Sequence, residues 1–555
     1  MDYKKLLLIF LVSIGISFAL YGNTIKGDFV YDDVFFIHRS ELRGLKALLD
    51  VWYESYLPYN QTTAAYRPLS IFTFALNFVL FGDSPTSFHT TNILLNGIVG
   101  FLVFLVVWKL FQNRILAIFT ALIFAFLPIH TEAVAFVKAR DDILATLFSL
   151  LSWVIFLSAT NRQKISVWGV LLSSIFWVVA VLGKEIAIVM PALFLLVFWI
   201  QKRATLLYVI KVFSFFIPAI LFYFLLRFMV LGSQFLARDV VFFIFDPLRE
   251  ADFITHIWTA FKIAFIYVSK TFVPIHLSAT YSYNHLKLVS SPLSSSETLL
   301  GIFLLGVLVL LVIYKRTRST LGVGALIFLL PYLILSKFFI QLSEIASEKW
   351  MYLPSVGLSV IAGFVLYYIF QYKKWLGILL LMVILAVYTP ILIQRNTIWA
   401  SKESLAKSMV RDAPDSAYAH FSLAEVYYEQ GKYKEAKTEI AQSLQIYPDY
   451  APFYNMVTLL ALKEGRNNIA GQALKKTIEL RPDELQALLL SKEGRYRESL
   501  DLINSFDSRV KRRSNVIFLF AVNYYKLGMI DEAKKYLHWD PSKSEEEKMQ
   551  ILEDF

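Results

Sequence analysis

The 555-residue sequence contains no cysteine, and charged residues make up only 17% of it. The absence of cysteine excludes disulfide bonds, thiolate metal sites and a cysteine nucleophile. Soluble proteins carry about a quarter charged residues, so the low charge excludes a soluble globular enzyme. Hydrophobic residues account for 57% of the chain, and this high fraction excludes intrinsic disorder.

Long apolar runs, such as 98–108 and 299–314, recur along the chain before Asn396. Runs of this length are typical of transmembrane helices, and we expect about eleven spans within residues 1–395. Residues 396–555 contain no run long enough to cross a bilayer, and their apolar residues recur at helical spacing. The sequence therefore predicts an all-α protein with a polytopic membrane helical bundle in 1–395 and a second helical domain in 396–555.

The net charge of +11 is concentrated in short clusters of Lys and Arg between the apolar runs. Such clusters mark cytoplasmic loops facing anionic lipid, and without a separate basic stripe they argue against nucleic acid as a partner. Lys4 and Lys5 predict a cytoplasmic N-terminus that is followed by an uncleaved first span. If residues 255–274 also spanned the membrane, the basic cluster at 315–318 would lie on the extracytoplasmic side, where such clusters are not expected. We therefore expect 255–274 to be an amphipathic or re-entrant helix on the outer face, and the tail to be extracytoplasmic.

The tail contains an internal repeat. Pro414, Pro448 and Pro482 are spaced 34 residues apart, and Gly431 and Gly465 show the same interval. Gly494 and Gly528 repeat the interval after a shorter step. A period of 34 residues with small residues at helix contacts resembles the tetratricopeptide repeat, which stacks helix pairs into an α-solenoid. About four such repeats predict a concave surface suited to peptides or proteins.

Two adjacent carboxylates, Asp32 and Asp33, follow the first span directly. Charge at a membrane surface is costly unless it is used or balanced, and a carboxylate there can act as general base on an acceptor hydroxyl. A solvated loop, or a cap for a helix that begins near Val34, is the alternative interpretation.

Five further segments with charged or histidine side chains fall on the same outer side in the predicted topology. Lys138 and Arg140 are the best phosphate candidates, because both lie where an anionic lipid headgroup would sit. Each segment also has a structural alternative: snorkelling cations, hydrogen-bonded histidines, an internal ion pair between Lys184 and Glu185, or a metal site. The candidate residues are Arg67, His130, Glu132, Lys138, Arg140, Asp141, Asp142, Lys184, Glu185, His276, Glu348 and Lys349.

The order and sidedness of these motifs resemble one family. Asp32-Asp33, Tyr66-Arg67-Pro68-Leu69, His130-Thr131-Glu132-Ala133-Val134, Gly183-Lys184-Glu185, Lys349-Trp350-Met351-Tyr352-Leu353-Pro354 and the external repeats are together similar to the transmembrane and tetratricopeptide-repeat O-mannosyltransferases. These are relatives of the protein O-mannosyltransferases with the C-type membrane glycosyltransferase (GT-C) fold. The resemblance implies a polyprenyl- or dolichyl-phosphate sugar as donor and an acidic catalyst in the first external loop, here Asp32 or Asp33. We assign the donor phosphate from position to Arg67, Lys138, Arg140, Lys184 and Lys349.

The function expected from these features is inverting transfer of a hexose such as mannose to an acceptor hydroxyl, with protein Ser or Thr presented by the repeats as the favoured acceptor. One base suffices for inversion, and no covalent intermediate is required. A flippase for lipid-linked sugars, a repeat scaffold without catalysis, and an enzyme that polymerises or ligates glycans are the alternatives. Dependence on a divalent metal is left open. The expected location is the plasma membrane in a prokaryote or the endoplasmic reticulum membrane in a eukaryote.

Overall fold

The computed structural model describes residues 2–554 except 38–41, 54–55, 57–64, 161–165, 201–205, 233–241, 315–319, 339–341, 481–486, 489, 492–493, 506–513 and 538–543. The basic cluster at 315–318 and Pro482 therefore lie outside the described residues. Helices dominate the described chain, and its one isolated β-bridge pairs Tyr281 with Ala346. The all-α prediction is confirmed.

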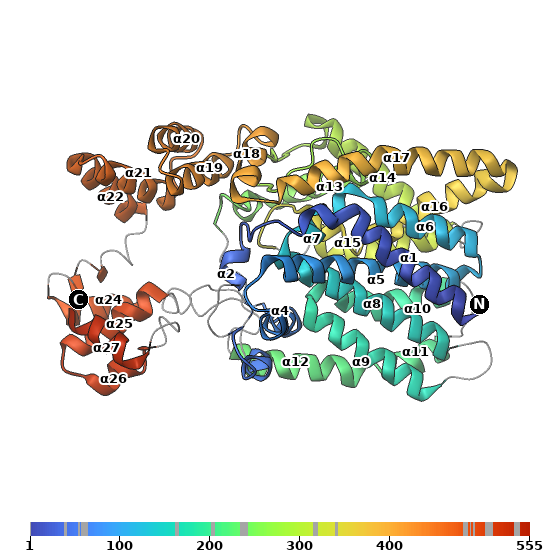
Figure 1. Cartoon of the computed structure of the whole chain (residues 1–555), viewed down its shortest axis with the longest axis horizontal. Coiled ribbons are helices and arrows are strands. Elements are labelled where there is room, and N and C mark those ends of the chain that lie inside the picture. Colours follow the sequence, from blue (N-terminus) through green and yellow to red (C-terminus); the bar gives the residue numbers. More distant parts are fainter. Residues whose placement is uncertain are drawn as a thin grey trace.

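The first part of the chain forms a bundle of roughly parallel helices (Figure 1). Two short helices, α2 (Asp33–Ile37) and α3 (Ala47–Asp50), and the short α7 (Thr131–Ala135) lie in its connections. Its longer helices are α1 (Tyr3–Tyr21), α4 (Pro68–Phe81), α5 (Pro85–Phe111), α6 (Arg114–Phe126), α8 (Arg140–Ala159), α9 (Val167–Gly183), α10 (Met190–Ile200), α11 (Leu206–Ser214), α12 (Ile217–Leu231), α13 (Phe253–Phe272), α14 (Ser296–Ile313), α15 (Thr320–Leu335), α16 (Ser355–Tyr372) and α17 (Lys374–Ile398).

In the part of the chain that the structure describes, seven helices are long and apolar enough to cross a membrane, or eight if α6 and α7, bent by 53°, form one broken span. Apolar side chains such as Leu8 and Phe303 are exposed on them, as expected for surfaces that face lipid. The expected count of about eleven is not confirmed. The difference lies in helices such as α9 and α15, which are apolar and pack in the bundle but have fewer than 18 residues. The chain is an integral membrane protein.

The helix α13 lies at one end of the bundle, the end at which α17 leads into the repeats, which we call the repeat side. It is not among the helices apolar enough to span. Its Lys262 pairs with Glu297 in the first turn of α14, at 3.2 Å, and its Ala260 carbonyl accepts a hydrogen bond from Tyr332 near the end of α15. This placement agrees with the amphipathic helix expected from the loop charges.

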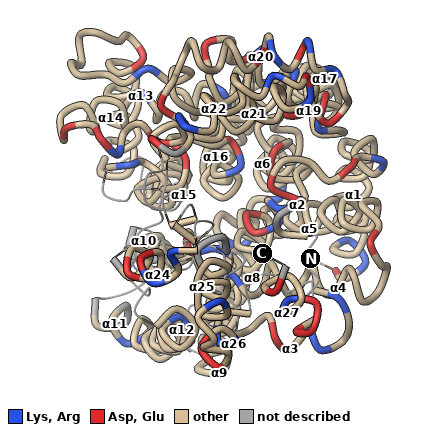
Figure 2. The backbone as a smooth tube through the Cα atoms, turned by 90° about the vertical axis from the view of Figure 1, so that its left-hand side faces the viewer, with Lys and Arg blue, Asp and Glu red and all other residues tan. Residues whose placement is uncertain are grey.

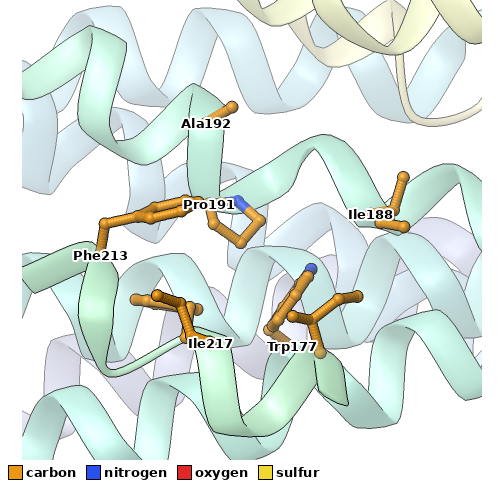
Figure 3. A pocket seen from close by; sticks show the side chains of 8 residues that line it. Trp177, Ile188, Pro191, Ala192, Phe213 and Ile217 are labelled. Atoms are coloured by element: carbon orange, nitrogen blue, oxygen red, sulfur yellow. The ribbon is translucent and has the colours of Figure 1, made fainter. Parts of the chain in front are cut away.

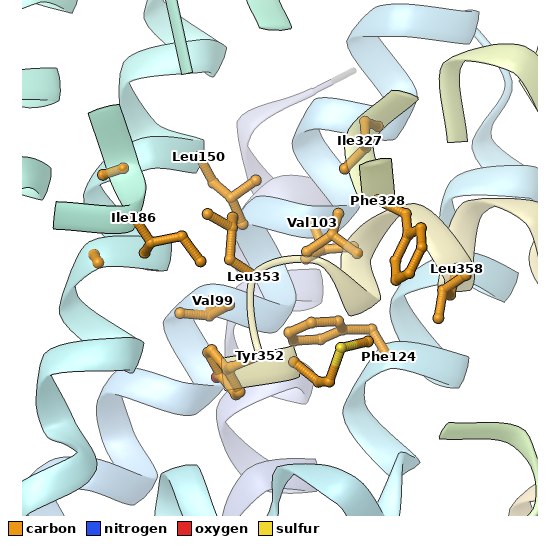
Figure 4. Close-up of a cluster of buried hydrophobic side chains, with 14 of the residues drawn as sticks. Val99, Val103, Phe124, Leu150, Ile186, Ile327, Phe328, Tyr352, Leu353 and Leu358 are labelled. Carbon is orange, nitrogen blue, oxygen red and sulfur yellow. The ribbon is translucent and has the colours of Figure 1, made fainter. Parts of the chain in front are cut away.

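The bundle core is a continuous apolar cluster. Figure 4 shows part of it, in which Val103, Phe124, Phe328 and Leu358 meet from different helices. Close helix contacts use small residues: a Cβ at Gly357 would lie 2.4 Å from the Gly324 carbonyl oxygen of α15. This rigid core carries the loops of the repeat side.

Paired helices follow α17, beginning with α18 (Lys402–Asp412). Gly431 and Gly465 adopt φ of +75° and +70° at the turns within two helix pairs, a conformation that favours glycine, so the 34-residue interval has a structural basis. The two pairs are α19 (Ala417–Glu429) with α20 (Tyr433–Ile446) and α21 (Ala451–Lys463) with α22 (Asn467–Leu480). A last group consists of α24 (Tyr496–Ser505), α25 (Ser514–Lys526), α26 (Ile530–Lys534) and α27 (Glu545–Asp554).

Candidate functional site

The candidate residues lie in the loops and helix ends of the repeat side. Figure 2, which views the molecule from this side, shows acidic and basic residues interspersed rather than separated by sign. The close pairing of opposite charges is required here, because a buried charge without a partner is strongly destabilising.

Asp33 is the first residue of α2 and is buried. Its Oδ2 accepts a hydrogen bond from the Val30 N–H at 3.1 Å, and its Oδ1 accepts one from the Lys138 N–H at 2.7 Å. Burial raises the pKa of Asp33 to about 8, although these N–H donors oppose the shift. Asp33 therefore ties the loop after α1 to the segment before α8.

Asp32 has different surroundings from its neighbour. Its side chain is 35% exposed, and its Oδ2 lies 3.7 Å from the Lys138 ammonium. The ammonium also lies 5.1 Å from the centre of the Phe36 ring. Asp32 is thus accessible to an incoming molecule and lies beside a cation, whereas Asp33 is enclosed by the backbone.

A second group of charges lies at the start of α4 and of α8 and in the turn after α9. Arg67 donates from Nη1 to Asp141 at 2.7 Å and from Nε to Glu185 at 2.9 Å. Lys184 contacts Asp142 at 2.5 Å and Asp141 at 3.6 Å. The alternative interpretation, that Lys184 and Glu185 pair with each other, is therefore wrong. Lys184 pairs with carboxylates at the start of α8, and Glu185 pairs with Arg67 at the start of α4.

A third group joins α7 to the segment before α16. The Lys349 ammonium lies 2.8 Å from Glu132 and 3.6 Å from Glu344. Burial alone would lower the pKa of Lys349, but Glu132 and Glu344 outweigh it and hold the pKa above its usual value. Glu348 pairs with Arg395 of α17 at 3.0 Å. These pairs connect the bundle to the helix that leads into the repeats.

The structure gives three predicted site residues other roles. Arg140 is fully buried and donates to Asn92 and Asn77, each at 2.7 Å, and to the Phe88 carbonyl. This arrangement favours a structural role over the predicted phosphate contact. His130 is hydrogen-bonded to Ser355 at 2.7 Å and packs against Phe124 and Tyr352. His276 is exposed, and its carbonyl accepts from Lys270.

Sequence reasoning missed several members of the site. Arg227 of α12 lies 3.4 Å from Glu185. The sequence contains a signal for Arg227, because a lone cation within an apolar run marks a functional position. Glu344 and Arg395 had no motif to mark them. Tyr56 donates to Asp141 at 3.3 Å, and Tyr418 comes from the first repeat. Their proximity depends on the fold.

No group of three or more His, Asp or Glu that could hold a metal ion occurs within the described part of the chain. Glu132 pairs with Lys349, and the carboxylates of Asp141 and Asp142 pair with Arg67 and Lys184. The metal arrangement considered for His130, Glu132 and these aspartates is therefore not formed by the described residues.

An apolar cavity of about 200 Å³, partly open to the surface of the bundle, lies between α9, α10, α11 and α12. Figure 3 shows Trp177, Pro191, Phe213 and Ile217 around it. Trp177 precedes Lys184 by seven residues, which corresponds to about 10 Å along a helix. The Trp177 end of the cavity therefore lies roughly two helical turns from the second group of charges, whereas Ile188, which also lines the cavity, follows Glu185 by three residues.

Known proteins match both parts of the chain. Residues 65–222 match the family model described as dolichyl-phosphate-mannose-protein mannosyltransferase, and residues 417–450 match the tetratricopeptide repeat. The first match includes Arg67, Lys138 and Lys184, whereas Asp32 precedes it.

Curated relatives extend the similarity beyond these segments. Protein O-mannosyl-transferase TMTC1 of Homo sapiens is 27% identical over 80% of the chain and 55% of its own length. Protein O-mannosyl-transferase F38B6.6 of Caenorhabditis elegans is 25% identical over 79% of the chain and 63% of its own length. Human TMTC3 is 25% identical over 86% of the chain and 61% of its own length. The chain thus spans between 55% and 63% of the length of these relatives.

Proposed function

Since the resemblance to the transmembrane and tetratricopeptide-repeat O-mannosyltransferases extends over about four fifths of the chain, we propose that this protein is a membrane glycosyltransferase. It moves a hexose such as mannose from a polyprenyl- or dolichyl-phosphate donor to a Ser or Thr hydroxyl of a protein. The reaction takes place on the extracytoplasmic side of the membrane, the side on which we place the repeats.

The observation that carries this proposal is the Asp32–Lys138 pair. It combines a part-exposed carboxylate with an ammonium 3.7 Å away, at the edge of a buried ion-pair network. A carboxylate in this position can take a proton from an acceptor hydroxyl, and an ammonium beside it can stabilise charge that develops on a leaving phosphate.

The chemistry assigned to these groups is a single displacement. Asp32 accepts the proton of the acceptor hydroxyl while its oxygen forms a bond to the anomeric carbon of the sugar. The bond from that carbon to the phosphate oxygen breaks, and the lipid phosphate leaves with the electron pair. Attack opposite the phosphate inverts the anomeric centre, so one base is enough.

The donor phosphate lies between Lys138 and the second group of charges in this proposal. Lys138 and Arg67 contact the phosphate, and Arg227 adds a third cation beside Glu185. The polyprenyl chain extends from there toward the apolar cavity lined by Trp177, Phe213 and Ile217. A phosphate near the cations and an apolar chain below them match the polarity of these two regions.

The test is transfer of radiolabelled mannose from polyprenyl-phosphate mannose to a Ser/Thr peptide by the purified protein. We expect Asp32→Asn to lower the transfer rate by about 10²- to 10⁴-fold, as for loss of a general base, with unchanged Tm. Asp28→Asn is the matched control, because Asp28 is exposed on the same loop. Wild-type activity of Asp32→Asn would remove Asp32 as base. Donor binding without transfer by the wild type would favour a transporter, and absence of donor binding would favour a scaffold.

A further inference from the structure

The first repeat is attached to the bundle through buried contacts on both sides of the α17–α18 junction. Trp399 stacks on Phe136 with ring centres 5.2 Å apart, and the Asp28 N–H donates to the Ala400 carbonyl at 3.0 Å. The buried hydroxyls of Ser282 and Ser416 lie 2.7 Å apart. These contacts fix the start of α19 relative to the first external loop.

A segment of the bundle also lies directly on the repeats. We call residues 242–245, all hydrophobic, the aromatic strap. Its Ile244 is fully buried in one cluster with Phe421 and Phe453 of α19 and α21. The Phe245 ring lies 4.7 Å from that of Tyr418. The first two repeats are therefore partly covered by the chain itself.

The aromatic strap is held on the bundle side by polar groups. The carbonyls of Ile244 and Phe245 accept from the N–H groups of Tyr283 at 2.7 Å and Ile345 at 3.0 Å. Asp246, which follows it, pairs with Lys337 at 2.8 Å, and both side chains are 0% exposed. The first repeat is thus a fixed part of the repeat side.

This attachment brings Tyr418 of α19 next to the proposed base. The ring of Tyr418 lies 6.4 Å from that of Tyr31, and their side chains are hydrogen-bonded. Burial raises the pKa of Tyr418, and the negative charge of Asp32 raises it further. Tyr31, Asp32 and Tyr418 are all partly exposed, and Tyr31 and Tyr418 meet where the loop after α1 contacts the first repeat.

We propose that the first repeat forms one wall of the acceptor site, with Tyr418 contacting an acceptor peptide whose hydroxyl is directed to Asp32. The inference rests on the proposed function and adds where the acceptor lies. A peptide suits this wall, because aromatic rings with hydroxyls offer both apolar area and hydrogen bonds to an extended backbone. Tyr418 is a positioning residue for the acceptor and takes no part in donor binding.

The experiment separates acceptor binding from donor chemistry in the full-length protein. Transfer of mannose to a Ser/Thr peptide gives the KM for the peptide, and release of free mannose to water without peptide reports the donor reaction. We expect Tyr418→Phe to raise the peptide KM about threefold and Tyr418→Ala about tenfold, since one hydrogen bond and then a ring contact are lost. The rate of release to water and the donor KM should stay at wild-type values.

The matched control is Tyr428→Ala. Tyr428 lies on the same helix, but its ring packs 5.5 Å from that of Tyr433, so the peptide KM should not change. An unchanged peptide KM in both Tyr418 variants would overturn the inference while the proposed function stands. The inference would also be overturned if Tyr418→Phe lost both transfer and release to water and melted at a lower Tm, because the residue would then be structural. A wild-type protein that neither transfers nor releases mannose would refute the proposed function itself.

Discussion

At the scale of single residues, Asp32 and Asp33 differ because one loop conformation places them in different surroundings. Asp33 is held by two backbone N–H donors from separate segments, while Asp32 faces Lys138 with part of its surface open. Two neighbouring carboxylates with such environments can divide their roles, one structural and one reactive. This contrast favours Asp32 as the base, a choice that the sequence left open.

Asp33→Asn tests the structural half of that division. Burial raises the pKa of Asp33 to about 8, so the folded protein holds a proton that the unfolded chain, with a pKa of about 3.9, releases. The resulting stabilisation is complete below the unfolded pKa and is lost as the pH rises through about 8. We expect Asp33→Asn to melt below the wild type near pH 5, with a gap that narrows toward higher pH. Melting curves in detergent measure this, and a gap that widens with pH would contradict it.

Lys138 and Arg140 show what a sequence can predict about such residues. Both are assigned to the donor phosphate from the sequence because they lie where an anionic lipid headgroup would sit. The structure turns Arg140 inward to Asn92 and Asn77, whereas Lys138 faces Asp32. The sequence could predict that positively charged side chains lie near this point. The direction in which each side chain points depends on partners from α4 and α5, which no local pattern reveals.

At the scale of elements, the aromatic strap depends on one buried ion pair. Replacing Lys337 with Met leaves the Asp246 carboxylate buried without its cation, a change that costs about 3–5 kcal/mol. We expect Lys337→Met to lower Tm and to loosen the repeats, so that trypsin cleaves faster at the exposed Lys402. Limited proteolysis followed by mass spectrometry measures the cleavage rate.

Two variants control this experiment. Lys262→Met breaks a pair whose Glu297 is 44% exposed, so we expect a change of at most about 1 kcal/mol and no new cleavage. Adding Asp246→Leu to Lys337→Met removes the unpaired charge and should restore much of the stability. Unchanged cleavage in Lys337→Met would show that the other contacts hold the repeats without the strap.

The elements themselves could be predicted to different degrees. Apolar runs predict the bundle helices, and the 34-residue interval predicts the helix pairs with their turns at Gly431 and Gly465, because both signals are local. The number of spans could not be obtained in this way. Helices such as α9 and α15 are apolar but short, and whether such a helix crosses the membrane depends on its neighbours.

At the scale of the whole molecule, the first repeats and the last helices differ in how they relate to the bundle. Apolar clusters that contain Val30, Phe136 and Ile244 of the bundle also include residues of α18, α19 and α21. By contrast, the clusters within α24–α27 contain only residues from 487 onward. The boundary expected at residue 395 therefore separates two sequence patterns, but bundle and first repeats share a core across it.

This difference predicts unequal effects of two truncations. A chain that ends at residue 480 loses α24–α27, whose apolar clusters are separate from those of the bundle. Distant, independent sites do not affect one another. The rates of transfer to a short peptide and of mannose release to water should therefore stay within about twofold of those of the full chain. A chain that ends at residue 400 exposes Phe136, Trp399 and Ile244, which favours aggregation. Size-exclusion chromatography and both assays on matched preparations distinguish the two. Loss of peptide transfer in the longer truncated chain, with release to water intact, would mean that α24–α27 also hold the acceptor, and the acceptor site would then extend beyond the first repeat.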